Sequence, residues 1–168
     1  MRPLNRLLSS SALGISLAIY ALYRSPNTTC NRLLFNLISN ANIRDARLAV
    51  QKALPLPSIL NGSLPGGLWV FAATLISGNV FIHYKSQRIN LQLLPCMIAV
   101  FFEIQQLLGL SKGTSDSFDI IAALAGWALA RPFLTKPTEP IQITDASTPH
   151  RVLCVGSYAI LILAHVQR

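Results

Sequence analysis

Long apolar runs alternate with short polar segments along most of this chain. The runs cover residues 7–23, 66–84, 89–110, 118–134 and 152–166 and contain few charged residues. A helix needs about 20 residues to cross the hydrocarbon core of a bilayer, with about 17 as the lower limit. The first four runs reach that length, and the fifth is slightly short. Because the runs lack the alternation of barrel strands, they predict an all-α, polytopic transmembrane bundle of four to five spans.

The first connection, residues 24–65, has a different pattern. Two sets of apolar residues recur there at helical spacing, and the second set lies opposite polar residues: Leu33, Leu34, Leu37 and Ile38, then Ala46, Val50, Ala53 and Leu54 against Arg44, Arg47 and Gln51. This spacing predicts amphipathic helices at the membrane interface. Pro65 is expected to begin the second span. We therefore expect a four-helix core over residues 1–134 with an amphipathic loop at 24–65, then a linker and fifth helix over 135–168.

Composition supports a membrane protein. Of the 168 residues, 52% are hydrophobic and only 12% are charged, and the net charge is +8. The basic residues fall mostly between the apolar runs, which suits lipid headgroups and argues against nucleic acid as a partner. Cys30, Cys96 and Cys154 have no paired spacing, so they are interpreted as packing residues, and no metal or cofactor is expected.

Charge also predicts an orientation. Residues 1–23 combine a basic flank with an apolar run but lack a small-residue cleavage pattern, which favours an uncleaved signal anchor. With the long first connection set aside, a cytoplasmic N-terminus places most basic residues of the short loops on the cytoplasmic side, as the positive-inside rule requires. These are Arg2, Arg6, Lys85, Arg88, Arg131, Lys136 and Arg151.

Glu103 is the most informative single residue, because it lies inside an apolar run with Gln106 at helical spacing. Ionisable groups within a membrane usually face a bundle interior, a partner or a water-filled cavity. With a rise of 1.5 Å per residue, Glu103 would lie about 10 Å below the end of its helix. A role as structural glue between helices is the alternative interpretation.

The next span begins with two further carboxylates. Asp116 at the N-cap and Asp119 three residues later resemble a capping box, so helix capping alone could account for both. A short hairpin would nevertheless bring Glu103, Gln106, Asp116 and Asp119 to one end of two antiparallel helices, as a polar cluster able to bind a headgroup or cation. Further along the same span, Ala122, Gly126 and Ala130 form a small-residue ridge, interpreted as a helix-packing surface.

The order Glu103, Gln106, a turn, Asp116, Asp119 and Gly126 resembles the signature of the VanZ-like family of small bacterial membrane proteins, named for a teicoplanin-resistance protein. The resemblance implies an envelope-associated protein of the bacterial inner membrane. Gly113 and Ala123 stand where the family usually has Arg and Asn, and the family's His is missing from residues 60–69.

Three functions remain open. The first is a VanZ-like envelope protein whose acidic cluster binds a headgroup or cation, with membrane lipids as partners. The second is an accessory subunit of a larger membrane complex. The third is an enzyme acting on a lipid-linked substrate, which is disfavoured because no nucleophile motif, phosphate loop or metal-ligand cluster appears and His83, His150 and His165 fall at the opposite membrane side. No catalytic residues are assigned.

Overall fold

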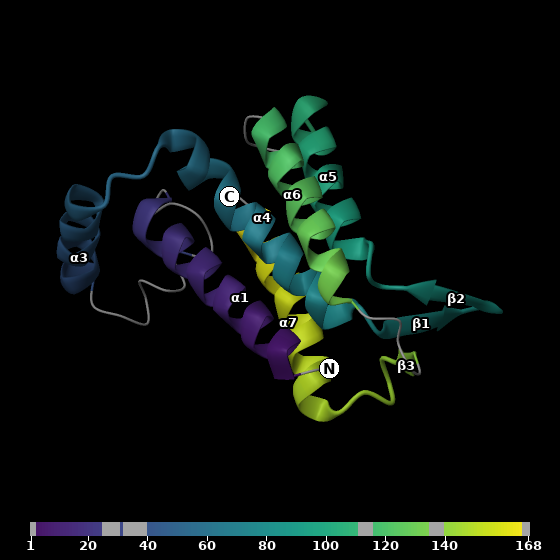
Figure 1. The fold of residues 1–168 in the computed structure, drawn as a ribbon. Coiled ribbons are helices and arrows are strands. Elements are labelled where there is room, and N and C mark those ends of the chain that lie inside the picture. Colours follow the sequence, from purple (N-terminus) through teal and green to yellow (C-terminus); the bar gives the residue numbers. More distant parts are fainter. Residues whose placement is uncertain (1–2, 25–30, 32–39, 111–115, 135–139, 166–168) are drawn as a thin grey trace.

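The computed structural model describes residues 3–24, 31, 40–110, 116–134 and 140–165. The described part is mostly helical, with a small sheet at one end (Figure 1). Its elements are α1 (Pro3–Tyr23), α3 (Asn40–Ala53), α4 (Ser58–Ser77), β1 (Val80–Tyr84), β2 (Gln87–Asn90), α5 (Leu94–Leu107), α6 (Ser117–Ala130), the 3₁₀-helix η1 (Arg131–Phe133), β3 (Ile141–Gln142) and α7 (Thr148–His165).

Helix α4 is the centre of the fold. It contacts α1, α5, α6 and α7, and its second half is almost continuously buried. A core cluster forms where these helices meet, and it consists of Trp69, Val70, Ala73, Cys96 and Ala123. Cys96 and Cys154 are buried free thiols, as expected for packing residues, whereas Cys30 lies outside the described residues.

Glycine permits the close crossing of α4 and α6. A Cβ atom at Gly126 would lie 2.2 Å from the carbonyl oxygen of Gly67, and one at Gly67 would lie 2.8 Å from that of Ala122. Real side chains do not tolerate such contacts with backbone atoms, so these two helices can approach only with glycine at the crossing. The ridge predicted from Ala122, Gly126 and Ala130 therefore lies against α4, with Gly126 and Ala130 buried.

Helix α1 packs on the bundle through polar and small side chains. Its buried residues are Asn5, Ser9, Ala12 and Ser16. The Ser16 hydroxyl donates to the carbonyl oxygen of Pro65 at 2.8 Å, and the Asn5 amide donates to that of Phe133 at 3.1 Å. The hydrogen-bonding face of α1 is thus directed inward.

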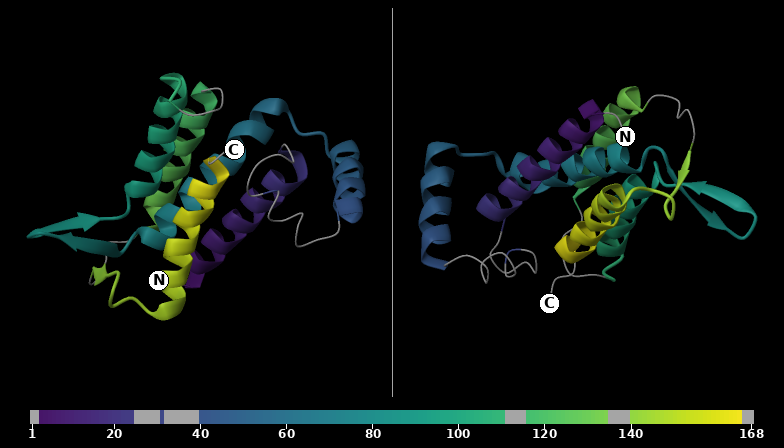
Figure 2. Two further views of the ribbon diagram at one scale, coloured as in Figure 1. Left: turned by 180° about the vertical axis from the view of Figure 1, so that it is seen from behind. Right: turned by 90° about the horizontal axis from the view of Figure 1, so that it is seen from below.

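Helix α7 lies along α4 (Figure 2) and is held there by polar contacts. The Trp69 indole N–H donates to the Ser157 carbonyl oxygen at 2.6 Å, and the hydroxyls of Ser77 and Tyr158 lie 2.9 Å apart. Tyr158 also packs edge-on against the Trp69 ring, with 6.3 Å between centroids. The predicted fifth helix, residues 152–166, falls mostly within α7, which begins earlier, at Thr148.

The prediction of an all-α fold is wrong at one end of the bundle. Residues 66–84 do not form one helix, because α4 ends at Ser77 and β1 follows. The sheet order is β2-β1-β3, with β1 antiparallel to β2 and parallel to β3. The chain turns between β1 and β2 at Lys85, whose φ of 55° is in the left-handed region. Strand pairing satisfies backbone groups that a longer helix would otherwise have satisfied.

Two other predicted boundaries are also corrected. Pro65 lies inside α4, seven residues after Ser58, and does not begin the helix. The run 89–110 starts in β2 and gives a helix of 14 residues, α5, about 21 Å long at 1.5 Å per residue. The run 118–134 divides into α6 and η1. Among the described helices, α1 and α4 are long and apolar enough to cross a membrane, and α5 is apolar but shorter.

Helix α3 contains the second amphipathic set predicted in the first connection except Leu54, which follows the helix. Its polar residues face the end of α1: the Gln51 amide donates to the Leu22 carbonyl oxygen at 2.6 Å, and the Arg47 guanidinium donates to that of Arg24. These bonds satisfy carbonyl groups that a helix C-terminus leaves without intrahelical partners. Leu48 and Leu54 remain exposed. The first predicted set, Leu33, Leu34, Leu37 and Ile38, lies outside the described residues.

Candidate functional site

A cavity of about 220 Å³ lies among the helices. The helix segments that contribute most of its lining residues lie at the end of the bundle away from the sheet (Figure 1). Helix α1 provides one wall, the first half of α4 provides the second, and α5 with α6 provides the third. The lining residues are Leu13, Gly14, Ser16, Leu17, Tyr20, Arg24, Gly62, Pro65, Gly66, Trp69, Ala99, Glu103, Asp119, Ala123 and Ile160. Most of this surface is apolar, so the charged side chains within it are its chemically distinctive feature.

Glu103 lines the cavity and is 5% exposed. Its carboxylate accepts the backbone N–H of Asp116, the N-cap residue of α6, at 3.2 Å. A helix N-terminus carries unpaired N–H groups and a partial positive charge, which together stabilise a carboxylate. The bond therefore fixes the position of Glu103 at the start of α6.

Asp116 and Asp119 have different positions relative to the cavity. The exposed Asp116 carboxylate accepts the Phe118 N–H at 2.9 Å, which is the N-cap predicted from the sequence. In a capping box, the residue three positions later would bond the N-cap N–H. Here the Asp116 N–H is bonded instead by Glu103, which belongs to the neighbouring helix α5. Asp119 is half-buried and lines the cavity instead.

The predicted polar cluster is therefore brought together only in part. Glu103 and Asp119 share the cavity, Asp116 contributes its backbone N–H to Glu103, and Gln106 is half-buried but does not line the cavity. The short α5–α6 connection places all four residues at the same end of two adjacent helices, as the sequence predicts (Figure 1). The four side chains differ in direction, so only those of Glu103 and Asp119 line the cavity.

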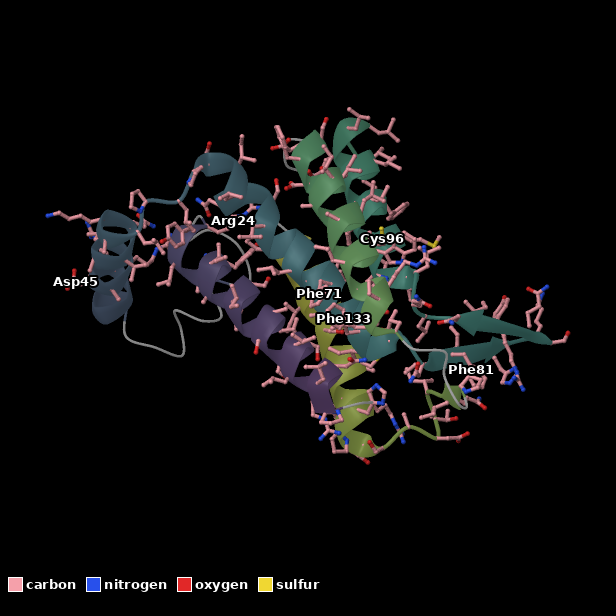
Figure 3. All side chains as sticks on the ribbon, in the orientation of Figure 1. Arg24, Asp45, Phe71, Phe81, Cys96 and Phe133 are labelled. Atoms are coloured by element: carbon pink, nitrogen blue, oxygen red, sulfur yellow. The ribbon has the colours of Figure 1, made fainter. Side chains whose placement is uncertain are left out.

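Arg24 and Tyr20 also line the cavity and were not predicted as site residues. Arg24 lies at the end of α1 (Figure 3), where its guanidinium donates to the Gly62 carbonyl oxygen at 2.8 Å and lies 5.8 Å from the centre of the Tyr20 ring. Its Nε atom is buried with no hydrogen-bond partner within the described residues. The spacing of four residues between Tyr20 and Arg24 was a usable signal, since it places both on one helix face.

The charged side chains of the cavity are suited to binding a polar ligand. Two carboxylates and a guanidinium can form strong, charge-assisted hydrogen bonds to a polar ligand. Within the described residues, no group of three His, Cys, Asp or Glu side chains could hold a metal ion. The imidazole of His150 lies elsewhere, 2.8 Å from the carbonyl oxygen of Ile76, and His83 belongs to β1.

Comparison of the chain with protein-family models, with curated proteins and with solved structures gives no match.

Proposed function

We propose that this chain is a VanZ-like integral membrane protein of the bacterial envelope, whose cavity binds the polar headgroup of a membrane amphiphile. The observation that carries the proposal is that Glu103 and Asp119 line one largely apolar cavity. Carboxylates in such a setting are expected where a polar ligand compensates for their loss of water. The resemblance of residues 103–126 to the VanZ-like signature supports the same role.

The polarity of α1 supports a membrane location. The core helix of a soluble protein buries its apolar face, and a hydropathy test alone does not distinguish such a helix from a membrane span. Helix α1 buries Asn5, Ser9 and Ser16, whereas Leu4, Leu7 and Ile15 are each at least half exposed. Water disfavours that distribution, but lipid favours it, because helices in a membrane associate through small and hydroxyl-bearing residues.

The outer surfaces of the other helices support the same location. Large apolar side chains are exposed on each of them: Met97, Phe101, Ile104 and Leu107 on α5, Phe118, Ile121, Leu124 and Leu129 on α6, and Val152, Leu153, Val155 and Ile160 on α7. Soluble monomers rarely expose large contiguous apolar patches. Leu108 and Leu110 extend the apolar surface beyond the short helix α5.

Native mass spectrometry of the purified protein tests headgroup binding. We expect the wild-type protein to retain a lipid-sized adduct in mild detergent, and the Glu103→Gln and Asp119→Asn variants to lose most of it. Asp45→Asn is the matched control, because Asp45 is exposed on α3 and does not line the cavity (Figure 3). If both cavity variants carry the same adducts as wild type and Asp45→Asn, the proposed function is wrong.

The VanZ-like assignment has a separate test. Expression of the chain in a susceptible bacterium should raise the teicoplanin concentration needed to stop growth, and the Asp119→Asn variant should lose that effect at equal membrane abundance. Equal protection by wild type and Asp119→Asn would mean that resistance does not depend on the cavity carboxylate. No protection by either protein would contradict the VanZ-like assignment.

A second candidate function, an accessory subunit of a membrane complex, is favoured by β2. This strand is at the edge of the sheet and all four of its residues are exposed. An unpaired edge can add a strand from another chain. Purification in mild detergent followed by mass spectrometry tests this candidate, and recovery of an 18.3 kDa protein alone would count against it.

A further inference from the structure

The cavity holds opposite charges on different walls. Arg24 belongs to the end of α1, whereas Glu103 and Asp119 belong to α5 and α6, and the first half of α4 lies between these walls. The Asp119 carboxylate accepts no hydrogen bond and forms no ion pair within the described residues. The Arg24 guanidinium uses one of its five N–H groups within the described residues, in the bond to the Gly62 carbonyl oxygen. One cavity thus offers an anionic and a cationic group with unused bonding capacity.

Each charge selects a different part of a ligand. A guanidinium matches the geometry of phosphate oxygens and binds them through paired hydrogen bonds. Carboxylates prefer a donor-rich cation, and a primary ammonium carries three N–H groups. A quaternary ammonium has no such donors and is usually held by aromatic faces. Two aromatic side chains line the cavity. The Tyr20 ring already has the Arg24 guanidinium near it, 5.8 Å from its centroid, and Trp69 is 4% exposed and packs against Tyr158, which disfavours that alternative.

The size and margin of the cavity indicate how much of the ligand it takes. Its volume of about 220 Å³ is below the 300–1,000 Å³ or so typical of pockets that enclose a whole small ligand. Leu17 of α1 and Ile160 of α7 line the cavity and are 42% and 41% exposed. The apolar margin therefore continues to the outer surface between α1 and α7, where acyl chains would remain in the bilayer.

We propose that the cavity binds an aminophospholipid, with the lipid phosphate at Arg24 and its primary ammonium at Asp119 and Glu103. This inference rests on the proposed headgroup-binding function and specifies its ligand. The lipid enters from the bilayer between α1 and α7, and its chains stay outside the cavity.

Lipid titrations on the full-length purified protein test the ligand class. The probes are phosphatidylethanolamine, phosphatidylcholine, phosphatidylglycerol and soluble glycerophosphoethanolamine, each followed by native mass spectrometry. We expect phosphatidylethanolamine to bind about tenfold or more tightly than the other two lipids, since each lacks one of the charge-assisted contacts. The soluble headgroup should bind more weakly than phosphatidylethanolamine, because it lacks the apolar contact with the margin. Equal binding of the three lipids, or of the soluble headgroup and phosphatidylethanolamine, would overturn the proposal.

Two variants make the test specific for each charge. Arg24→Gln should weaken phosphatidylethanolamine and phosphatidylglycerol alike, because both carry the phosphate. Asp119→Asn should weaken phosphatidylethanolamine but leave phosphatidylglycerol unchanged or slightly tighter. Asp45→Asn is the control and should change neither. A loss of both lipids in Asp119→Asn, with normal insertion and thermal stability, would contradict the assignment of the ammonium to this carboxylate.

The outcomes also separate this inference from the proposed function. If Asp119→Asn weakens every lipid equally, headgroup binding stands and the aminophospholipid assignment falls. If no lipid binds, or the variants match wild type with every probe, the proposed function itself falls.

Discussion

Glu103 joins two helices across the turn that connects them. Its carboxylate accepts the Asp116 N–H at 3.2 Å, one of the four N–H groups that α6 cannot satisfy within itself. The side chain of Asp116 satisfies another, that of Phe118. The start of α6 is thus capped by one carboxylate of its own and one from α5. Glu103 has a structural role and also lines the cavity, so the two interpretations made from the sequence are compatible.

Replacement of Glu103 by leucine tests the structural role. It leaves the Asp116 N–H without its acceptor, at a cost of about 1–3 kcal/mol, whereas Glu103→Gln keeps an acceptor oxygen and should cost less. The measurement is thermal unfolding of the detergent-purified protein. Gln106→Leu is the control, because Gln106 is half-buried on the same helix and its side chain makes no hydrogen bond within the described residues. A Glu103→Leu variant as stable as wild type would show that the bond does not stabilise the turn.

Gly126 allows the close crossing of α4 and α6, and its replacement by alanine tests that role. In Gly126→Ala the new methyl group would lie 2.2 Å from the Gly67 carbonyl oxygen, so α4 and α6 must separate, at a cost of about 1–3 kcal/mol. Gly156→Ala is the matched control, since a Cβ atom there meets nothing within 4 Å. Thermal unfolding should show a lower midpoint for the first variant only. Equal midpoints would mean that the crossing is not closely packed.

Only the site residues that are close together in the sequence could be predicted as neighbours. Glu103 and Asp119 lie on either side of one turn, so the hairpin alone brings them together. Whether Asp116 or Asp119 points into the cavity depends on which of them caps α6, and both fit a capping pattern. Arg24 reaches the cavity only because α1 packs beside the first half of α4, a tertiary arrangement that residue spacing does not encode.

At the scale of elements, hydropathy predicts that helices are present, but it does not predict where they end. The residues of β1, Val80–Tyr84, are as apolar as the helix before them, and β-branched and aromatic residues occur in both. The turn after β1 has Lys85 in the left-handed region, where glycine or asparagine is the usual signal. The hairpin therefore carries no sequence signature of its turn, and its strands appear in the sequence as parts of two long helices.

Helix α7 gives a prediction at the same scale. Its docking depends on polar contacts with α4, including the pair formed by the Ser77 and Tyr158 hydroxyls. Tyr158→Phe removes one hydroxyl and should loosen α7 by about 1 kcal/mol, or about fivefold in the population of the open form. Cys154 reports this directly, because it is 1% exposed on the docked face.

The measurement is the rate at which a membrane-permeant maleimide labels Cys154 in a protein with Cys30 and Cys96 replaced by Ala. Tyr158→Phe should raise the rate about fivefold if the population of the undocked form rises as expected. Tyr84→Phe makes the same chemical change at an exposed site on β1 and should leave the rate unchanged. Identical rates in all three proteins would show that the hydroxyl pair does not hold α7.

At the scale of the whole molecule, successive long helices alternate in direction. The sheet and the described N-terminus lie at one end, and α3, the end of α5 and the start of α6 lie towards the other (Figure 1). Lys85, Arg88, Arg131 and Arg151 all lie at or near the sheet end. If the chain has the proposed membrane location and the first connection is again set aside, the positive-inside rule predicts that the sheet end faces the cytoplasm and that the cavity lies in the outer half of the membrane. An aminophospholipid would then enter from the outer leaflet.

Two single-cysteine variants test this orientation, in a background with Cys30, Cys96 and Cys154 replaced by Ala. Lys52→Cys places a thiol on α3, Gln87→Cys places one on β2, and both positions are exposed. A membrane-impermeant maleimide should label the thiol at position 52 in intact spheroplasts and the thiol at position 87 only after permeabilisation, because in the proposed membrane location α4 would cross the bilayer between them. Labelling of both positions after permeabilisation is the control for thiol reactivity.

The reverse pattern in intact spheroplasts would invert the orientation and move the cavity to the inner leaflet. Labelling of both positions in intact spheroplasts would mean that α4 does not separate two compartments, and the membrane-spanning bundle would be wrong.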